Sequence, residues 1–145
     1  MNIRVAAASD AKYIQSLLTQ LGYPEFNERE VEEKIRLYRQ EGYRLLVAEE
    51  EKQVVGFISL HWFELMHWKG KMGRITSFCI DEKFRSRGVG QQLLAAGEKV
   101  LFDEAAVKVE VTSNARRTQA HNFYLKAGYT EDSRRFVKYR DQSAP

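Results

Sequence analysis

The apolar positions of this chain alternate between helical and strand spacing, and they predict its elements in order. A short strand is predicted over residues 3–8. A helix whose apolar side chains recur every three or four residues follows from Ser9, its capping residue, to Gly22. Asn27 and Glu30 have the pattern of a capping box, so a second helix should begin there and end at Gly42. Two helices therefore precede the main run of strands.

The rest of the pattern predicts a mixed sheet with helices between its later strands. The predicted elements are strands over 43–49, 53–63 and 72–80, a helix after Gly90, a strand over 107–111, a helix over 115–127 and a last strand over 136–140. The segment 53–63 has apolar residues at both alternate positions, which is typical of a central strand buried on both faces. Because a helix separates 72–80 from 107–111, these strands should be parallel, whereas the earlier hairpins are antiparallel. The predicted order is β-α-α-β-β-β-α-β-α-β.

Composition narrows the setting and the partners. With 145 residues and a single cysteine, Cys79, we expect one domain over residues 1–145, without disulfides, in the reducing cytoplasm. The net charge is +3, but residues 70–145 hold 14 basic and 9 acidic side chains, which suits a polyphosphate ligand. No apolar run has the length of a membrane span, the basic residues form no stripe with aromatics, and His61 and His67 are weak metal candidates. We therefore expect no membrane, nucleic-acid or metal partner, and homodimerisation stays open.

A short loop with two glycines links the strand 72–80 to the helix that follows. Gly88 and Gly90 let the backbone approach a ligand closely, and the first amides of a helix carry positive partial charge. Arg85 and Arg87 add two full charges beside them. The third glycine of a dinucleotide-binding motif is missing, and no Gly-Lys-Ser/Thr follows as a P-loop requires. The loop therefore predicts a diphosphate site of another kind.

This loop and a later block resemble the motifs of the GCN5-related N-acetyltransferases, the GNAT superfamily. Arg85, Gly88 and Gly90 fill the pattern of Arg or Gln, two residues, Gly, one residue, then Gly or Ala. The block from Asn114 to Tyr129 is similar to the family's later motif, in which an Asn caps a helix and a Tyr lies four residues before a Gly. The resemblance covers essentially the whole chain. It implies the mixed α/β fold of that family and an acetyl-CoA-dependent N-acetyltransferase.

The resemblance also implies roles for named residues. Phe78 and Ile80 would offer backbone groups to the acetyl and pantetheine arm, and the amide of Phe78 would stabilise the oxyanion. Asn114 would hydrogen-bond the pantetheine, and Tyr124, near the thioester sulfur, would protonate the departing thiolate. The residues that would surround the pyrophosphate are Arg85, Arg87, Gly88, Val89, Gly90 and Gln91.

The general base is left open by the sequence. Many members of the family have a Glu where this chain has Ser77, and a serine accepts no proton near neutral pH. An alkylamine with a pKa near 10 is neutral in about one molecule per thousand at pH 7, so deprotonation requires about 4 kcal/mol. The alternatives are a water chain ordered by Ser77 and Thr76, or one of the side chains Glu64, Glu110 and His121.

A weaker resemblance, to the aminoalkylphosphonate N-acetyltransferases, concerns the acceptor. It rests on the segments 56–61, 112–129 and 135–138. It implies a small zwitterionic amine, whose anion would dock on a guanidinium fork. The candidate guanidinium groups are those of Arg74, Arg116 and Arg117. The alternatives are a protein lysine or N-terminus, which the acidic cluster over 28–33 would attract, and a non-catalytic CoA-binding sensor.

Overall fold

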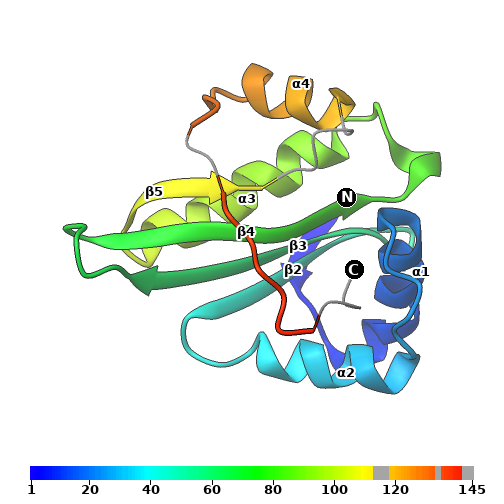
Figure 1. Cartoon of the computed structure of the whole chain (residues 1–145). Helices are drawn as coiled ribbons and strands as arrows, with labels where there is room; N and C mark the ends of the chain where they lie inside the picture. Colours follow the sequence, from blue (N-terminus) through cyan, green and yellow to red (C-terminus); the bar gives the residue numbers. More distant parts are fainter. Residues whose placement is uncertain (113–117, 133–134, 142–145) are drawn as a thin grey trace. The chain divides into compact units, whose positions relative to one another are not determined.

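The computed structural model describes residues 1–112, 118–132 and 135–141 (Figure 1). Contacts within the chain divide it into two compact units, Met1–Thr112 and Ser113–Pro145. The first unit holds the sheet and three α-helices, and the second holds α4 (Thr118–Lys126). Among the helices of the described segments, none is both long and apolar enough to cross a membrane. The single domain expected over residues 1–145 stays a prediction.

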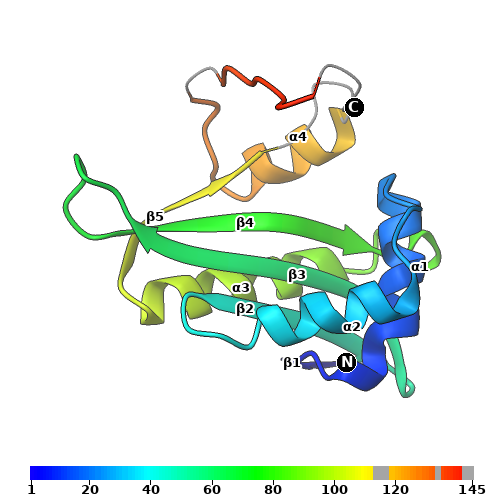
Figure 2. The ribbon, with the colours of Figure 1, turned by 60° about the horizontal axis from the view of Figure 1, so that its bottom comes forward.

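The sheet of the first unit has five strands in the order β1-β2-β3-β4-β5 (Figure 2). They are β1 (Asn2–Val5), β2 (Tyr43–Glu50), β3 (Gln53–Glu64), β4 (Lys71–Ile80) and β5 (Ala106–Val111). The first four strands pair antiparallel, whereas β4 and β5 are parallel and are connected by α3 (Val89–Asp103). In the central strand β3, residues 54–60 are all buried. The mixed sheet, its central strand and its parallel crossover are therefore as predicted.

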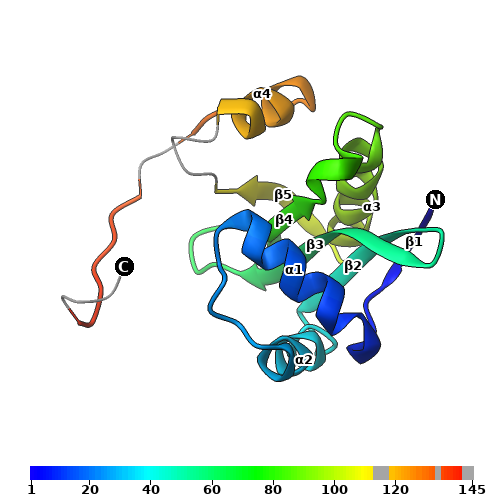
Figure 3. The same ribbon diagram turned by 90° about the vertical axis from the view of Figure 1, so that its right-hand side faces the viewer.

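Helices cover both faces of this sheet (Figure 3). On one face, α1 (Ala11–Leu21) and α2 (Glu28–Leu37) enclose an apolar core with Phe57 and Cys79. On the other face lies α3, where a Cβ added at Gly97 would be 2.9 Å from Cδ1 of Ile58. Successive strand residues point to opposite faces, so Phe57 and Ile58 belong to different cores. This explains why both alternate positions of β3 are apolar.

The two predicted helix starts have different outcomes. The capping box at α2 is confirmed, since Asn27 Oδ1 accepts the Glu30 amide at 2.8 Å and Glu30 Oε1 accepts the Asn27 amide at 3.0 Å. The cap predicted at Ser9 is wrong, because a 3₁₀ turn, Ala8–Asp10, precedes α1. The buried carboxylate of Asp10 accepts the Ala7 amide there at 2.8 Å. A charged acceptor makes a stronger hydrogen bond than the serine hydroxyl would.

Two predicted ends also need correction. The helix α2 ends at Leu37 rather than at Gly42, because Tyr38 leaves helical geometry and places its hydroxyl 3.0 Å from Thr76 Oγ1. The last predicted strand, over 136–140, is absent from the described segment 135–141. A strand requires a neighbour for its backbone groups and a face to bury, and the apolar pattern supplies neither by itself. The side chains of Phe136, Val137 and Tyr139 are all more than half exposed.

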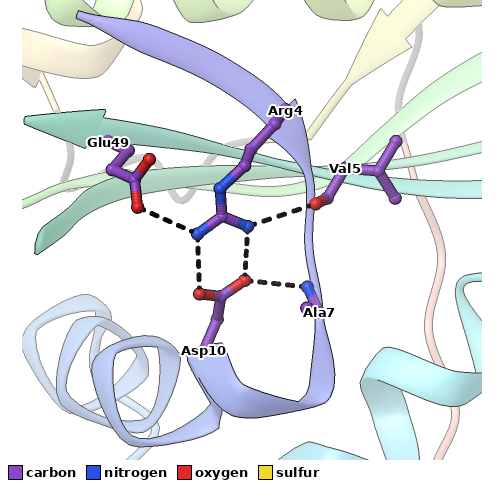
Figure 4. A network of polar contacts seen from close by, with 5 residues as sticks. All are labelled: Arg4, Val5, Ala7, Asp10 and Glu49. Carbon is purple, nitrogen blue, oxygen red and sulfur yellow. Dashed lines mark hydrogen bonds and ion pairs between the residues drawn. The ribbon is translucent and has the colours of Figure 1, made fainter. Parts of the chain in front are cut away.

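A charged network ties β1 to the start of α1 (Figure 4). Arg4 donates from Nη1 and Nη2 to both carboxylate oxygens of Asp10, at 2.8 and 2.9 Å, and Nη2 also lies 3.2 Å from Glu49 Oε2 on β2. Burial alone would raise the pKa of Asp10, but the hydrogen bonds from Arg4 and from the Ala7 amide outweigh it and hold that pKa below its usual value. The hydrogen bond to Asp10 likewise raises the pKa of Arg4. The network fastens the first strand, which is the edge of the sheet.

Candidate active site

The predicted diphosphate loop leads from β4 into α3 through a left-handed turn. Ser86 and Gly88 have φ angles of 64° and 81°, and Gly88 is the residue that precedes the helix. A Cβ added at Gly88 would meet no atom within 4 Å, so the protein leaves open space on that side of the backbone. No side chain of the described segments caps this helix start. The first amides of α3 therefore form a cradle that fits a diphosphate.

Two arginines stand in the same loop. Arg85 donates from Nε to the Ile80 carbonyl at 3.1 Å, which fixes the loop against the end of β4 and leaves its Nη groups as further donors. The guanidinium of Arg87 lies 5.2 Å from the ring centroid of Phe84. A cavity of about 280 Å³ opens beside Arg87, but its wall also contains Glu50 and Glu51, so it suits a phosphate less well than the helix start does.

The pairing between β4 and β5 ends before β4 does. It runs from Lys71 opposite Ala106 to Ile75 opposite Val111, where β5 ends, whereas β4 continues to Ile80. The half-buried residues Phe78 and Ile80 lie on this later part of β4. The structure therefore brings the predicted pantetheine segment directly before the predicted diphosphate loop.

A β-bulge in β4 gathers several hydroxyl groups. The register between β3 and β4 shifts after Ser59, which lies opposite Ser77, so that Thr76 is an extra residue. The buried Ser59 hydroxyl hydrogen-bonds with Ser77 Oγ and lies 2.6 Å from Thr76 Oγ1, which is itself 3.0 Å from the Tyr38 hydroxyl. Ser77 thus belongs to a chain of hydroxyls that joins β3, β4 and the end of α2.

The acidic candidates for the general base have different surroundings. Glu110 on β5 accepts both Nε and Nη2 of Arg74 on its Oε1, with the Nε contact at 2.6 Å. Arg74 also lies over the ring of Phe63, 5.0 Å from its centroid. This pairing occupies Glu110, which weakens the hypothesis that Glu110 is the general base. It also compensates the charge of Arg74, which weakens the hypothesis that Arg74 binds the anion of the acceptor. Glu64 is exposed at the end of β3.

Sequence reasoning missed a stack of rings that surrounds His61 on β3. The imidazole of His61 lies between Tyr43, at 4.3 Å between ring centroids, and Phe63, at 4.9 Å. The ring of Tyr38 meets Tyr43 edge-on at 5.2 Å, and His61 Nδ1 lies 2.7 Å from the Gly42 carbonyl oxygen. The signal in the sequence was the two-residue spacing along β3, which places alternate side chains on a single face.

Tyr124, the predicted proton donor, lies on α4 in the second unit. Its half-buried ring makes edge contacts with Phe123, at 5.5 Å between centroids, and with Tyr129, at 5.7 Å. His121, another candidate base, is half-buried on the same helix. Asn114, together with Arg116 and Arg117, lies outside the described residues. The roles predicted for these residues and for the loop stay predictions.

Comparison with known proteins assigns the chain to a family. A family model described as "Acetyltransferase (GNAT) family" matches residues 11–129. The chain belongs to this family. The resemblance seen in the sequence is thereby confirmed, together with the fold class and, at the level of the GNAT family, the enzyme class of N-acetyltransferases that use acetyl-CoA as co-substrate.

Individual relatives agree with the assignment. The chain is 36% identical to an aminoalkylphosphonate N-acetyltransferase of Salmonella typhimurium over 96 residues, which are 66% of this chain and 61% of that protein. It is 30% identical to the uncharacterized N-acetyltransferase YhfO of Bacillus subtilis over 96% of this chain and 95% of the relative. A glucosamine-6-phosphate N-acetyltransferase from Arabidopsis thaliana has the same fold, with a TM-score of 0.83, 22% identity, and coverage of 97% of this chain and 98% of that one.

Proposed function

We propose that this chain moves the acetyl group of acetyl-CoA to the primary amine of a small molecule by direct attack in a ternary complex. The observation that carries the proposal is the uncapped start of α3 behind the left-handed Gly88, directly after a strand that continues beyond its parallel neighbour. A diphosphate cradle and an extended backbone edge follow each other in the order that CoA requires. We further propose that residues 1–145 act as one domain in the cytoplasm.

In this proposal the cofactor lies along β4 and ends at the loop. The amides of Val89, Gly90 and Gln91 hold the diphosphate, and the exposed guanidinium groups of Arg85 and Arg87 neutralise its charge. The backbone of Phe78 and Ile80, with Asn114, holds the pantetheine arm, as the family resemblance implies. Acetyl-CoA supplies the activated thioester, and the protein supplies alignment.

In the reaction itself, groups of this chain stabilise the developing charge and transfer protons. The amine nitrogen attacks the thioester carbon, and the amide of Phe78 donates to the oxygen on which negative charge develops. As the carbon–sulfur bond breaks, Tyr124 gives its phenolic proton to the sulfur and regains a proton from the nitrogen side. Ser77 contributes through the hydroxyl chain with Ser59 and Thr76, which provides a row of polar groups beside Phe78.

A small zwitterionic amine is the acceptor class that we favour. The 36% identity with an aminoalkylphosphonate N-acetyltransferase supports it over a protein lysine. The ion pair with Glu110 leaves Arg74 less suited to dock the anion than the sequence implied, which shifts this role to Arg116 or Arg117.

Turnover decides between this proposal and its rivals. Release of free thiol from acetyl-CoA is measured with an aminoalkylphosphonate, an aminoglycoside, a polyamine and a lysine peptide at equal concentration. We expect the highest kcat/KM for the aminoalkylphosphonate. A preference for the peptide would refute the small-molecule acceptor, and CoA binding without turnover of any amine would identify a non-catalytic sensor.

A further inference from the structure

The imidazole of His61 is held in one tautomer. Its Nδ1 lies 2.7 Å from the carbonyl oxygen of Gly42, which can only accept a hydrogen bond. Nδ1 must therefore carry the hydrogen, and the neutral ring has its lone pair on Nε2. Gly42 ends the turn between α2 and β2, and its carbonyl also accepts the Trp62 amide at 2.9 Å, so this acceptor is fixed by the sheet itself.

The plane of the ring is fixed as well. Tyr43 and Phe63 sandwich it with interplanar angles of 15° and 26°, and the half-buried side chain cannot turn without breaking the stack. The charged residue opposite His61 in the sheet register is Arg74 on β4, and Glu110 on β5 compensates it. The groups that face His61 from β2, β3, β4 and β5 thus place no uncompensated cation against the ring.

The ring also lies on the face of the sheet that carries the hydroxyl chain. Ser59 and His61 are two residues apart on β3 and so share a face. Tyr38 joins the two groups physically, because its hydroxyl contacts Thr76 and its ring contacts Tyr43. Within this group of neighbours, the hydroxyl groups are of a kind that accepts a proton poorly, and Glu110 is occupied by Arg74. His61 is the member of this group whose side chain, an imidazole, is of the type most often used as a general base.

We propose that His61 is the general base of the acetyl transfer, in the place of the carboxylate that β4 lacks at Ser77; the inference rests on the function proposed above. His61 Nε2 takes one proton from the acceptor ammonium, directly or through one water, and becomes imidazolium. The neutral amine then forms the carbon–nitrogen bond, the carbon–sulfur bond breaks, and a second proton leaves the nitrogen for the sulfur to give the thiol. The imidazolium returns its proton to solvent, so that the net products are the amide, CoA and one proton.

The test compares pH profiles of His61→Asn and His61→Gln with the wild type. Asn keeps a donor close to the position of Nδ1 and Gln keeps a polar group close to that of Nε2, but neither can take a proton. His67→Asn, in the exposed turn between β3 and β4, is the matched control. The rise in Tm on adding CoA shows that each variant is folded and binds the cofactor.

We expect both His61 variants to lose about 10²-fold in kcat/KM at pH 7.5 with an alkylamine, while His67→Asn is unchanged. Wild-type kcat/KM should change little from about pH 7.5 upward, because a base that takes the proton of the ammonium form does not depend on the fraction of neutral amine. The variants should instead rise about tenfold per pH unit toward the pKa of the amine near 10. The deficit should therefore nearly vanish by about pH 9.5, and it should be small at pH 7.5 for trifluoroethylamine, which is already neutral.

Two results would overturn the assignment. A deficit that is equal at every pH and for both kinds of amine would show that His61 only supports the structure, and unaltered activity would show that it has no part in the reaction. Failure of the function itself has a different signature, because the wild type would then turn over no amine at any pH.

Discussion

Gly88 is a single residue on which the proposed cofactor site depends. Its φ of 81° is unfavourable for a side chain, and the space beside it is open in the protein. Gly88→Val should therefore cost about 1–2 kcal/mol of stability through backbone strain and should also place a branched side chain where the diphosphate approaches. CoA at about a hundred times its Kd should stabilise the wild type by about 2.7 kcal/mol, and this gain should be absent from the variant.

The matched control for this variant is Gly22→Val. Gly22, after α1, also has a positive φ, 111°, and no atom within 4 Å of an added Cβ, but it lies outside the loop. It should lose similar stability and keep the full increase in Tm with CoA. If Gly88→Val kept that increase too, the diphosphate would bind elsewhere.

The predicted role of Tyr124 is tested at the same scale. Tyr124→Phe keeps the ring and its contacts with Phe123 and Tyr129 but removes the proton donor. We expect kcat to fall about 10²-fold, with acetyl-CoA affinity nearly unchanged, because the hydroxyl acts as sulfur charge develops. Tyr129→Phe removes the neighbouring hydroxyl in the same way and should have little effect. Equal kcat values for wild type and Tyr124→Phe would reduce Tyr124 to a packing role.

Sequence reasoning anticipated features that local backbone geometry determines and missed those that tertiary contacts determine. Gly88 was predictable because a turn before a helix has a local signature. The fixed orientation of the His61 ring was not predictable, because it depends on contacts with the Gly42 carbonyl and with two rings, one of them on another strand. The pairing of Arg74 with Glu110 joins residues far apart in sequence, so the composition of neither segment could indicate it.

Among the elements, the close contact between α3 and β3 offers a direct test of how the helix packs on the sheet. A Cβ at Gly97 would lie 2.9 Å from Ile58 Cδ1 and 3.3 Å from Leu60 Cδ2, so Gly97→Ala should force the helix away from the sheet at a cost of about 1–3 kcal/mol. Ile58→Val removes Cδ1, the nearer atom. Gly97→Ala should therefore be less destabilising in the Ile58→Val background, which urea unfolding of the four proteins in the double-mutant cycle would show.

The control for α3 is Ala95→Val, on the exposed side of the same helix, which should change stability far less than Gly97→Ala. Purely additive effects of Gly97→Ala and Ile58→Val would mean that Ile58 is not what limits the approach of the helix.

Elements were predictable where their cause is local. The capping box at Asn27 and Glu30 and the two-sided apolar pattern of β3 are written in adjacent residues, and both are confirmed. The strand expected over 136–140 failed because strand formation depends on a partner. The bulge at Thr76 was not predictable, because the apolar pattern around it looks like that of an ordinary buried strand.

For the whole molecule, the Arg4 network predicts how stability depends on pH. The folded pKa of Asp10 is lowered, so its ionised form stabilises the fold at pH values above about 4, the unfolded value, and this contribution is lost as the pH falls through the folded pKa. Asp10→Asn should thus lower the free energy of unfolding by about 2 kcal/mol at pH 7. In acid, the free energies of unfolding of the variant and the wild type should become similar.

Urea unfolding at several pH values between 7 and 3 would measure this difference. Asp103→Asn, which breaks the exposed ion pair with Lys99 on α3, is the matched control and should have a much smaller effect. A stability difference between wild type and Asp10→Asn that persists unchanged in acid would show that the Asp10 charge is not its source.

The extra residue at Thr76 has a consequence for aligning this chain with other sequences. Arg74 and Ser77 are three residues apart, yet they lie opposite His61 and Ser59, which share a face, because the bulge inverts the alternation of β4 between them. A chain that is one residue shorter at Thr76 would pair with β3 without a bulge, and Arg74 and Cys79 would keep their present faces. Loss of the one residue at Thr76 is therefore compatible with the strand pairing, and an alignment gap in β4 belongs at this position. A gap placed earlier in β4 would equate side chains that lie on opposite faces of the sheet. Ser77 and Ile80 both follow the bulge, so the number of residues between them is unaffected.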